Sequence, residues 1–114
     1  MDKNLSRIDF LLKHIDLVIN DVKGKTLEEF ASSSLQVRAT AFSLVQIGEQ
    51  MSKLEKEFGT VYPEMPWFEA IRFRNLIVHV YHIVDADQIY KTAIEEMEGL
   101  KNHVLTLNSN YLKV

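Results

Sequence analysis

The segment 74–81, with the sequence Arg-Asn-Leu-Ile-Val-His-Val-Tyr, places four side chains capable of chemistry among apolar neighbours. Arg74 carries a permanently charged guanidinium that suits phosphate, and His79 can exchange a proton near neutral pH. Asn75 can donate and accept hydrogen bonds, and Tyr81 carries a hydroxyl that another enzyme could modify. No other segment of the chain concentrates such groups, so the sequence predicts a functional site here.

The spacing within this segment restricts how the four side chains can act together. On an α-helix, at roughly 100° per residue, Asn75 and His79 lie one turn apart, whereas Arg74 and Tyr81 share an adjacent line. Arg74 and His79 are then roughly 140° apart. They can act on one phosphate only if the helix ends or bends near His79, or if a second copy of the chain completes the site. The spacing therefore points to a homodimer.

Periodic apolar positions predict the elements that must hold this segment. Helices are expected at about 4–22, for a short turn from Leu27, at about 35–58, from Pro66 through the site segment, and from Asp85 onward. The helix that carries the site should be anchored by apolar bulk from Trp67, Phe68, Ile71, Phe73 and Leu76. Strand-type alternation is absent. The predicted fold is all-α, an up-and-down four-helix bundle with a short extra helix, in a single domain 1–114.

Local signals set the limits of these helices. Thr26 and Glu29 form a capping-box pattern for the short helix, which should carry Phe30 inward, and the serines 32–34 offer a cap for the next helix. In the second long helix, Leu35, Phe42, Val45 and Glu49 trace one line beside a broader apolar face. Gly48 in that helix costs about 1 kcal/mol against alanine, which predicts that another backbone packs closely there. The last helix has a single apolar stripe, formed by Ile89, Ala93, Met97, Leu100, Val104 and Leu107.

The segment 65–81 resembles the HEPN-domain toxins of the HepT type. Their hallmark is Arg, four residues, His, one residue, Tyr, usually preceded by Pro-Trp and an Ile, and this chain has all of these in order. Upstream, Gln46-Ile47-Gly48-Glu49 resembles the family's Ile-Gly-Glu, and Val84-Asp85 resembles the start of its last helix. The resemblance covers most of the chain and implies a HEPN-like bundle.

The resemblance also implies a function and a partner. It identifies the chain as the ribonuclease toxin of a toxin-antitoxin pair, with a cognate nucleotidyltransferase as antitoxin. Tyr81 would be the acceptor of AMP from that partner, and the added charge and bulk beside Arg74 would block an RNA phosphate. The chain has no Gly-Ser with paired aspartates of a nucleotidyltransferase, so it would be the acceptor and not the donor. No cofactor is implied.

The residues themselves permit RNA cleavage without a metal. The ribose 2′-hydroxyl would attack the adjacent phosphate, His79 would move protons, and Arg74 would hold the phosphate oxygens. Asn75 is placed to support His79 or the phosphate, and Glu49, directly after Gly48, could hydrogen-bond the arginine or histidine of the site helix. Ribonuclease activity itself comes from the resemblance, because the spacing only allows it.

Three other interpretations fit parts of the same pattern. Arg74 could pair with Glu49 or Glu69 while a backbone carbonyl satisfies His79, which would make the set a buried polar contact between helices. His79 and His82 could bind a metal, although no carboxylate at ligand spacing joins them. A non-catalytic module that docks a nucleotide or a nucleotidyltransferase is the alternative function.

Composition narrows the class of protein. Cysteine is absent, which removes disulfides, thiolate catalysis and Cys-type zinc sites and suits a reducing cytoplasm. No signal peptide is expected, and the longest apolar stretch, 76–84, is interrupted by His79 and His82 and is too short to span a bilayer. A cytoplasmic protein without membrane contact is therefore expected. The net charge of -3 argues against broad, non-specific binding of nucleic acid, although Arg72 and Arg74 could form a local positive spot.

Overall fold

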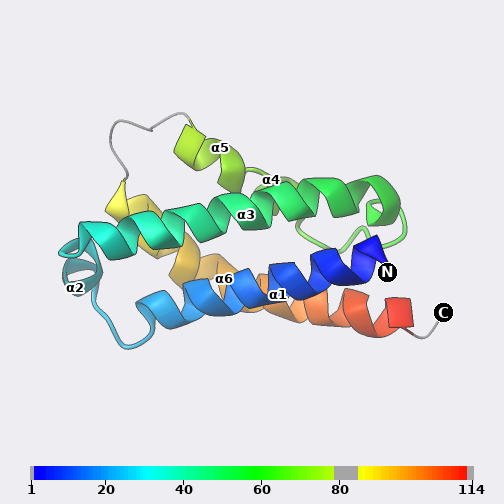
Figure 1. The fold of residues 1–114 in the computed structure, drawn as a ribbon, viewed down its shortest axis with the longest axis horizontal. Helices are drawn as coiled ribbons and strands as arrows, with labels where there is room; N and C mark the ends of the chain where they lie inside the picture. The colour runs from blue at the N-terminus through cyan, green and yellow to red at the C-terminus, as the bar shows by residue number, and fades with distance from the viewer. Residues whose placement is uncertain (1, 79–84, 113–114) are drawn as a thin grey trace.

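The computed structural model describes residues 2–78 and 85–112, and within them every regular element is a helix (Figure 1). The chain begins with α1 (Lys3–Val22), α2 (Leu27–Ala31) and α3 (Ser34–Phe58), and continues with α4 (Trp67–Ile71), α5 (Phe73–Val78) and α6 (Ala86–Leu112). The all-α prediction is confirmed. None of the helices in these two ranges combines the length and the apolarity that crossing a membrane requires.

The helix limits follow the local signals in the sequence. The capping box forms, because the Thr26 hydroxyl accepts from the Glu29 backbone N–H while the Glu29 carboxylate accepts from the Thr26 N–H. Ser33 caps α3, and the Asp85 carboxylate accepts from two backbone N–H groups at the start of α6. Gly24 follows the end of α1 with φ of 72°, a left-handed conformation that glycine adopts at little cost. The predicted starts of α2, α3 and α6 are therefore confirmed to within one residue.

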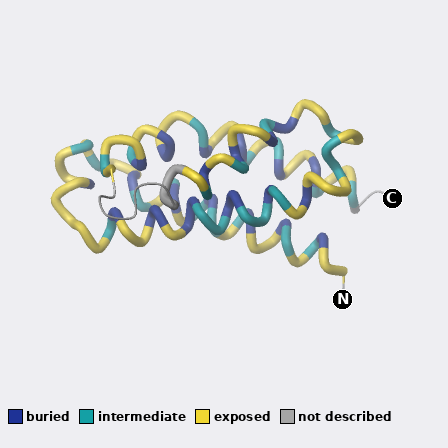
Figure 2. Tube along the Cα trace, turned by 90° about the horizontal axis from the view of Figure 1, so that it is seen from above, coloured by how far each residue is buried: buried dark blue, intermediate teal, exposed yellow. Residues whose placement is uncertain are grey.

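Three long helices form the body of the bundle. In Figure 1, α1, α3 and α6 run along the long axis of a molecule that measures 46 × 28 × 26 Å, with α2 at one end and both chain ends at the other. Along each of these helices, buried residues alternate with exposed ones, as expected for helices that pack on one side (Figure 2). Phe30 is fully buried, as predicted. The predicted apolar stripe of the last helix is also buried, at Ile89, Ala93, Met97, Leu100, Val104 and Leu107.

The helix that carries the site is not continuous, and the prediction of one helix starting at Pro66 is wrong. Helix α4 ends at Ile71, and α5 begins at Phe73 after a turn at Arg72. On one straight helix, Trp67 and Phe73, six residues apart, would point about 120° apart. The turn lets both side chains enter the core, where Trp67 is 7% and Phe73 2% exposed.

The two aromatic residues at the start of α4 differ from each other. Trp67 is buried, and its indole Nε1 donates to the Tyr62 carbonyl at 2.9 Å, which confirms its role as a core anchor. Phe68 is 69% exposed, so the prediction that it anchors the helix is wrong. Its position on the outer side of a one-and-a-half-turn helix leaves only the Arg72 guanidinium, 5.4 Å from its ring centre, as a described ring contact.

Candidate functional site

Helix α5 is positioned by close packing against Gly48 of α3. An added Cβ at Gly48 would lie 2.8 Å from the Arg74 backbone nitrogen, 3.1 Å from the Arg74 Cβ and 3.2 Å from the Ile71 carbonyl oxygen. Contacts that short with backbone atoms force one element to move. The prediction that a backbone packs on Gly48 is confirmed, and the backbone is that of Arg74 itself. The contact with Gly48 therefore sets where the Arg74 backbone lies relative to α3, and Arg74 is the candidate phosphate-binding residue.

Arg74 is half-buried and Asn75 is exposed at the start of α5. The Asn75 N–H donates to the Arg72 carbonyl at 2.8 Å, which joins the turn to the new helix. Within residues 2–78 and 85–112, the Arg74 guanidinium has no ion pair, and in particular none with Glu49 or Glu69. The interpretation in which either carboxylate neutralises Arg74 is therefore not what this part of the chain shows. Among the described residues, no carboxylate therefore neutralises the Arg74 charge.

Glu49 lies one residue beyond the contact between α3 and α5. It is half-buried, and its carboxylate has no hydrogen bond to any of the described residues. The structure thus brings Glu49 beside the arginine-bearing helix without joining it to Arg74. Its supporting role stays a prediction.

Two predicted site residues, His79 and Tyr81, fall in the segment 79–84, outside the described residues. The same holds for His82 of the alternative metal pair. The roughly 140° relation between Arg74 and His79 stays a prediction for that reason. Among the residues that are described, no three His, Cys, Asp or Glu side chains gather as metal ligands would.

The charges around α4 are mixed. Burial raises the pKa of Glu96 on α6 above its usual value, and the nearby Glu69 and Glu95 carboxylates raise it further. The Arg72 guanidinium acts in the opposite direction and lowers that pKa. Neither Arg72 nor Arg74 forms an ion pair among the described residues. The local positive spot expected from the two arginines stays a prediction.

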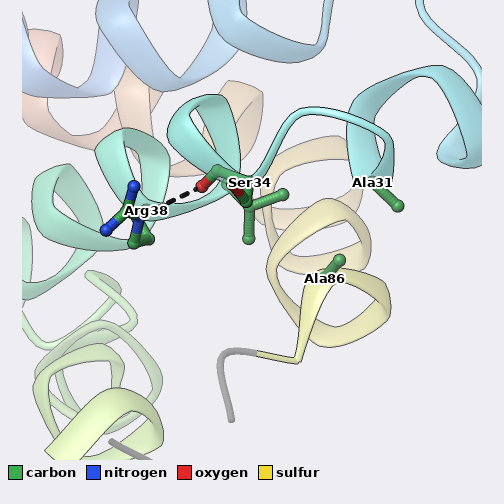
Figure 3. Close-up of a pocket in the computed structure, with 5 residues that line it drawn as sticks. Ala31, Ser34, Arg38 and Ala86 are labelled. Carbon is green, nitrogen blue, oxygen red and sulfur yellow. Dashed lines mark hydrogen bonds between the residues drawn. The ribbon is translucent and has the colours of Figure 1, made fainter.

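A cationic side chain that the sequence analysis did not select lies near the start of α3. Arg38 is exposed and borders a hollow of about 270 Å³ that is lined by Ala31, Ser34, Val37, Arg38 and Ala86. Figure 3 shows α2, α3 and α6 meeting around this hollow, with the Arg38 Nε donating to the Ser34 carbonyl at 3.4 Å. The sequence does contain a signal for Arg38. Its helical spacing from Phe42, Val45 and Glu49 places all four residues on one side of α3.

The two remaining histidines are held by neighbours away from α5. The His14 Nδ1 lies 3.2 Å from the Ser43 hydroxyl and its ring packs on Phe10, and burial lowers the pKa of His14. The His103 Nδ1 lies 3.2 Å from the Tyr62 hydroxyl. Both therefore contribute to helix packing.

Comparison with known proteins gives one consistent result. Residues 5–107 match the family described as Ribonuclease HepT-like. A candidate RNase of Caldanaerobacter subterraneus subsp. tengcongensis is 31% identical over 97 residues, which cover 85% of this chain and 87% of that protein. A probable ribonuclease HepT of Thermococcus cleftensis is 28% identical over 82% of this chain and 86% of its own length. A candidate RNase of Methanocaldococcus jannaschii is 31% identical, with 80% and 75% covered. No solved structure matches at a significant level.

Proposed function

Because the chain belongs to the Ribonuclease HepT-like family, we propose that it is a metal-independent endoribonuclease whose catalytic pair is Arg74 and His79. The observation that carries this proposal is the packing of the Arg74 backbone on Gly48, which positions a half-buried arginine that has no ion pair among the described residues. An arginine held in this way can bind a phosphate without first leaving a carboxylate.

The reaction needs no group beyond these side chains and the RNA. The 2′-oxygen attacks the adjacent phosphorus, and its proton passes to the His79 imidazole. The bond between phosphorus and the 5′-oxygen breaks, and that oxygen takes a proton from the imidazolium. The products are a 2′,3′-cyclic phosphate and a free 5′-hydroxyl. Arg74 stabilises the negative charge on the phosphate oxygens during transfer, while Asn75 and Glu49 orient the reacting groups.

The site requires a second copy of the chain if Arg74 and His79 diverge by roughly 140°, as they would on one continuous helix. A two-fold contact that includes α4, α5 and the edge of α3 near Gly48 would bring two copies of each residue to one cleft. The exposed Phe68 ring on α4 supplies an apolar anchor for such a contact. Sedimentation at micromolar concentration should show a dimer that Phe68→Ser weakens, and a wild-type chain that is only monomeric would contradict the two-fold site.

The proposal also includes regulation of the ribonuclease by a cognate nucleotidyltransferase antitoxin. The Tyr81 oxygen would attack the α-phosphorus of ATP, pyrophosphate would leave, and the phenol proton would pass to solvent. The resulting phosphodiester adds negative charge near Arg74, which competes with the RNA phosphate. Intact-mass analysis after incubation with the partner and ATP should show one added AMP on wild type and none on Tyr81→Phe. Equal labelling of both chains would exclude Tyr81 as the acceptor.

Cleavage of RNA by the purified chain tests the catalytic proposal directly. Arg74→Ala and His79→Ala should each reduce the rate by about 10²- to 10⁴-fold, and EDTA should leave the rate unchanged. Arg7→Ala and His103→Ala are the matched controls, because they remove the same side-chain types from other surfaces, and circular dichroism verifies that each variant folds. Full activity in His79→Ala, or its loss in EDTA, would contradict the mechanism. A wild-type chain that accepts AMP but cleaves no RNA would favour the non-catalytic module.

A further inference from the structure

An exposed stripe runs along α3 beside the helix that carries Arg74. At 100° per residue, Arg38, Phe42, Val45 and Glu49 fall within an arc of about 60°. Phe42 is 60% exposed and Arg38 is exposed, while Val45 and Glu49 are half-buried. A phenyl ring this exposed contributes little to the core, and a helix surface gains nothing from it in water. The stripe is therefore a candidate binding surface.

The stripe leads away from Arg74 in steps that helix geometry gives. Arg74 lies over Gly48, and Gly48 is six residues from Phe42 and ten from Arg38 along α3. These separations correspond to about 9 Å and about 15 Å along the helix axis, and to about 120° and about 80° around it. A few extended nucleotides that turn part of the way around α3 cover such a distance. A strand bound at Arg74 can therefore reach Phe42 and Arg38.

The chemistry of this arrangement matches single-stranded nucleic acid. Aromatic side chains stack bases of any sequence, and arginines beside them neutralise phosphates. The one carboxylate on the stripe, Glu49, directly follows Gly48, on which the Arg74 backbone packs. At the other end, the Arg38 guanidinium has no ion pair among the described residues and borders an open hollow (Figure 3). A duplex could not lay its stacked bases against Phe42.

We propose that this stripe binds the single-stranded RNA next to the cleaved phosphate, with Phe42 stacking on a base and Arg38 holding a phosphate a few nucleotides away. The inference rests on the proposed function, because Arg74 at the Gly48 contact marks the cleaved phosphate. It adds a binding site to that function, for the unpaired RNA that extends beyond the reacting linkage.

Binding of a 2′-O-methyl uridine oligomer of about twelve nucleotides tests the stripe, because the blocked 2′-oxygen cannot attack and cleavage plays no part. Phe42→Ala should weaken binding about tenfold, the loss expected for one stacked base, without changing the salt dependence. Phe42→Trp should keep the affinity. Arg38→Gln should reduce the slope of log affinity against log salt by about 0.7, the share of one phosphate on a single strand. Lys13→Gln on α1 makes the same charge change elsewhere and should have little effect.

The outcomes separate this inference from the catalytic proposal. Cleavage of a dinucleotide by the wild-type chain reports on catalysis alone, because so short a substrate does not reach Arg38. The oligomer could show the affinity loss in Phe42→Ala and the smaller salt slope in Arg38→Gln while the wild-type chain cleaves nothing. That result would support the stripe and contradict the catalytic proposal. An unchanged salt slope in Arg38→Gln, or unchanged affinity in Phe42→Ala, would overturn the stripe. So would sedimentation that shows Phe42→Ala converting a dimer to monomer, because the ring would then belong to a protein contact.

Discussion

Polar side chains are paired differently in two regions of the molecule. One region is the end of the bundle where α1 begins and α6 ends, and the other is the side where α5 packs on α3. At the chain ends, polar side chains from distant parts of the sequence bind each other in the pairs Asp2–Tyr111, Asn4–Glu57 and Tyr62–His103. Beside α5, Arg74 packs on Gly48, and neither Arg74 nor the adjacent Glu49 forms an ion pair among the described residues. A polar group that already has a partner stabilises the fold, whereas a cation held in place without one is available to a ligand.

Within this comparison, the largest effect on cleavage and stability should come from a change at Gly48, which positions Arg74. Gly48→Ala places a methyl group 2.8 Å from the Arg74 backbone nitrogen, so α5 must shift. Displacing a catalytic group by about 1 Å can cost about 10²-fold in rate, and overpacking typically costs about 1–3 kcal/mol of stability. RNA cleavage and urea unfolding of the same preparation measure both quantities.

Gly99→Ala is the matched control for that change. Gly99 lies in α6, and an added Cβ there would have no heavy atom within 4 Å. The variant should gain up to about 1 kcal/mol of stability from helix propensity and keep its cleavage rate. Equal cleavage in the Gly48 and Gly99 variants would show that the α3–α5 contact does not position Arg74.

A smaller effect is expected where a buried polar group is paired. Thr40 is fully buried on α3, and its hydroxyl donates to the Asp21 carboxylate at 2.7 Å. Thr40→Val keeps the shape and removes this bond, which should cost about 1 kcal/mol in urea unfolding. The cleavage rate should stay near the wild-type value, since Thr40 is eight residues from Gly48 on α3 and Asp21 belongs to α1. A strong loss of cleavage in Thr40→Val would contradict the view that paired polar groups stabilise the fold without taking part in the site.

The smallest effect should be a pH-dependent one at the chain ends. The hydrogen bond from Tyr111 lowers the pKa of Asp2, and the same bond raises the pKa of Tyr111. A lowered carboxyl pKa contributes stability above the unfolded value near 3.8 that is lost as pH falls through the folded pKa. A raised tyrosine pKa contributes stability below about 10 that is lost as pH rises through its folded value. Tyr111→Phe should therefore lower the melting temperature slightly at neutral pH and match wild type at both extremes.

The sequence predicted most of the bundle because its signals are local. The capping box at Thr26, the serine cap at Ser33 and the apolar stripe of α6 each depend on residues within a few positions of one another. The break at Arg72 was not predicted, because Trp67 and Phe73 are both apolar and only the three-dimensional core shows that both must point inward. Local patterns therefore set the helices, and tertiary packing sets where one of them divides.

The candidate site shows the same division. Gly48 predicted a close backbone, but nothing in the sequence named Arg74 as the neighbour. Phe68 looked like an anchor because aromatic residues usually are, and its exposure depends on how short α4 is. Arg38 is one arginine among several along the chain, and its place beside an exposed Phe42 becomes visible only when the outer side of α3 is known. His79 and Tyr81 stay predictions.

The contact between Gly48 and Arg74 also ties together two positions that are 26 residues apart in the chain. A residue without a side chain is usually thought to carry no chemical information, yet here it determines where a charge is presented. Natural selection on the charge should therefore act on the glycine as well. In related chains that present arginine from this helix, we expect position 48 to change only when α5 changes with it. Positions 48 and 74 would then change together in evolution.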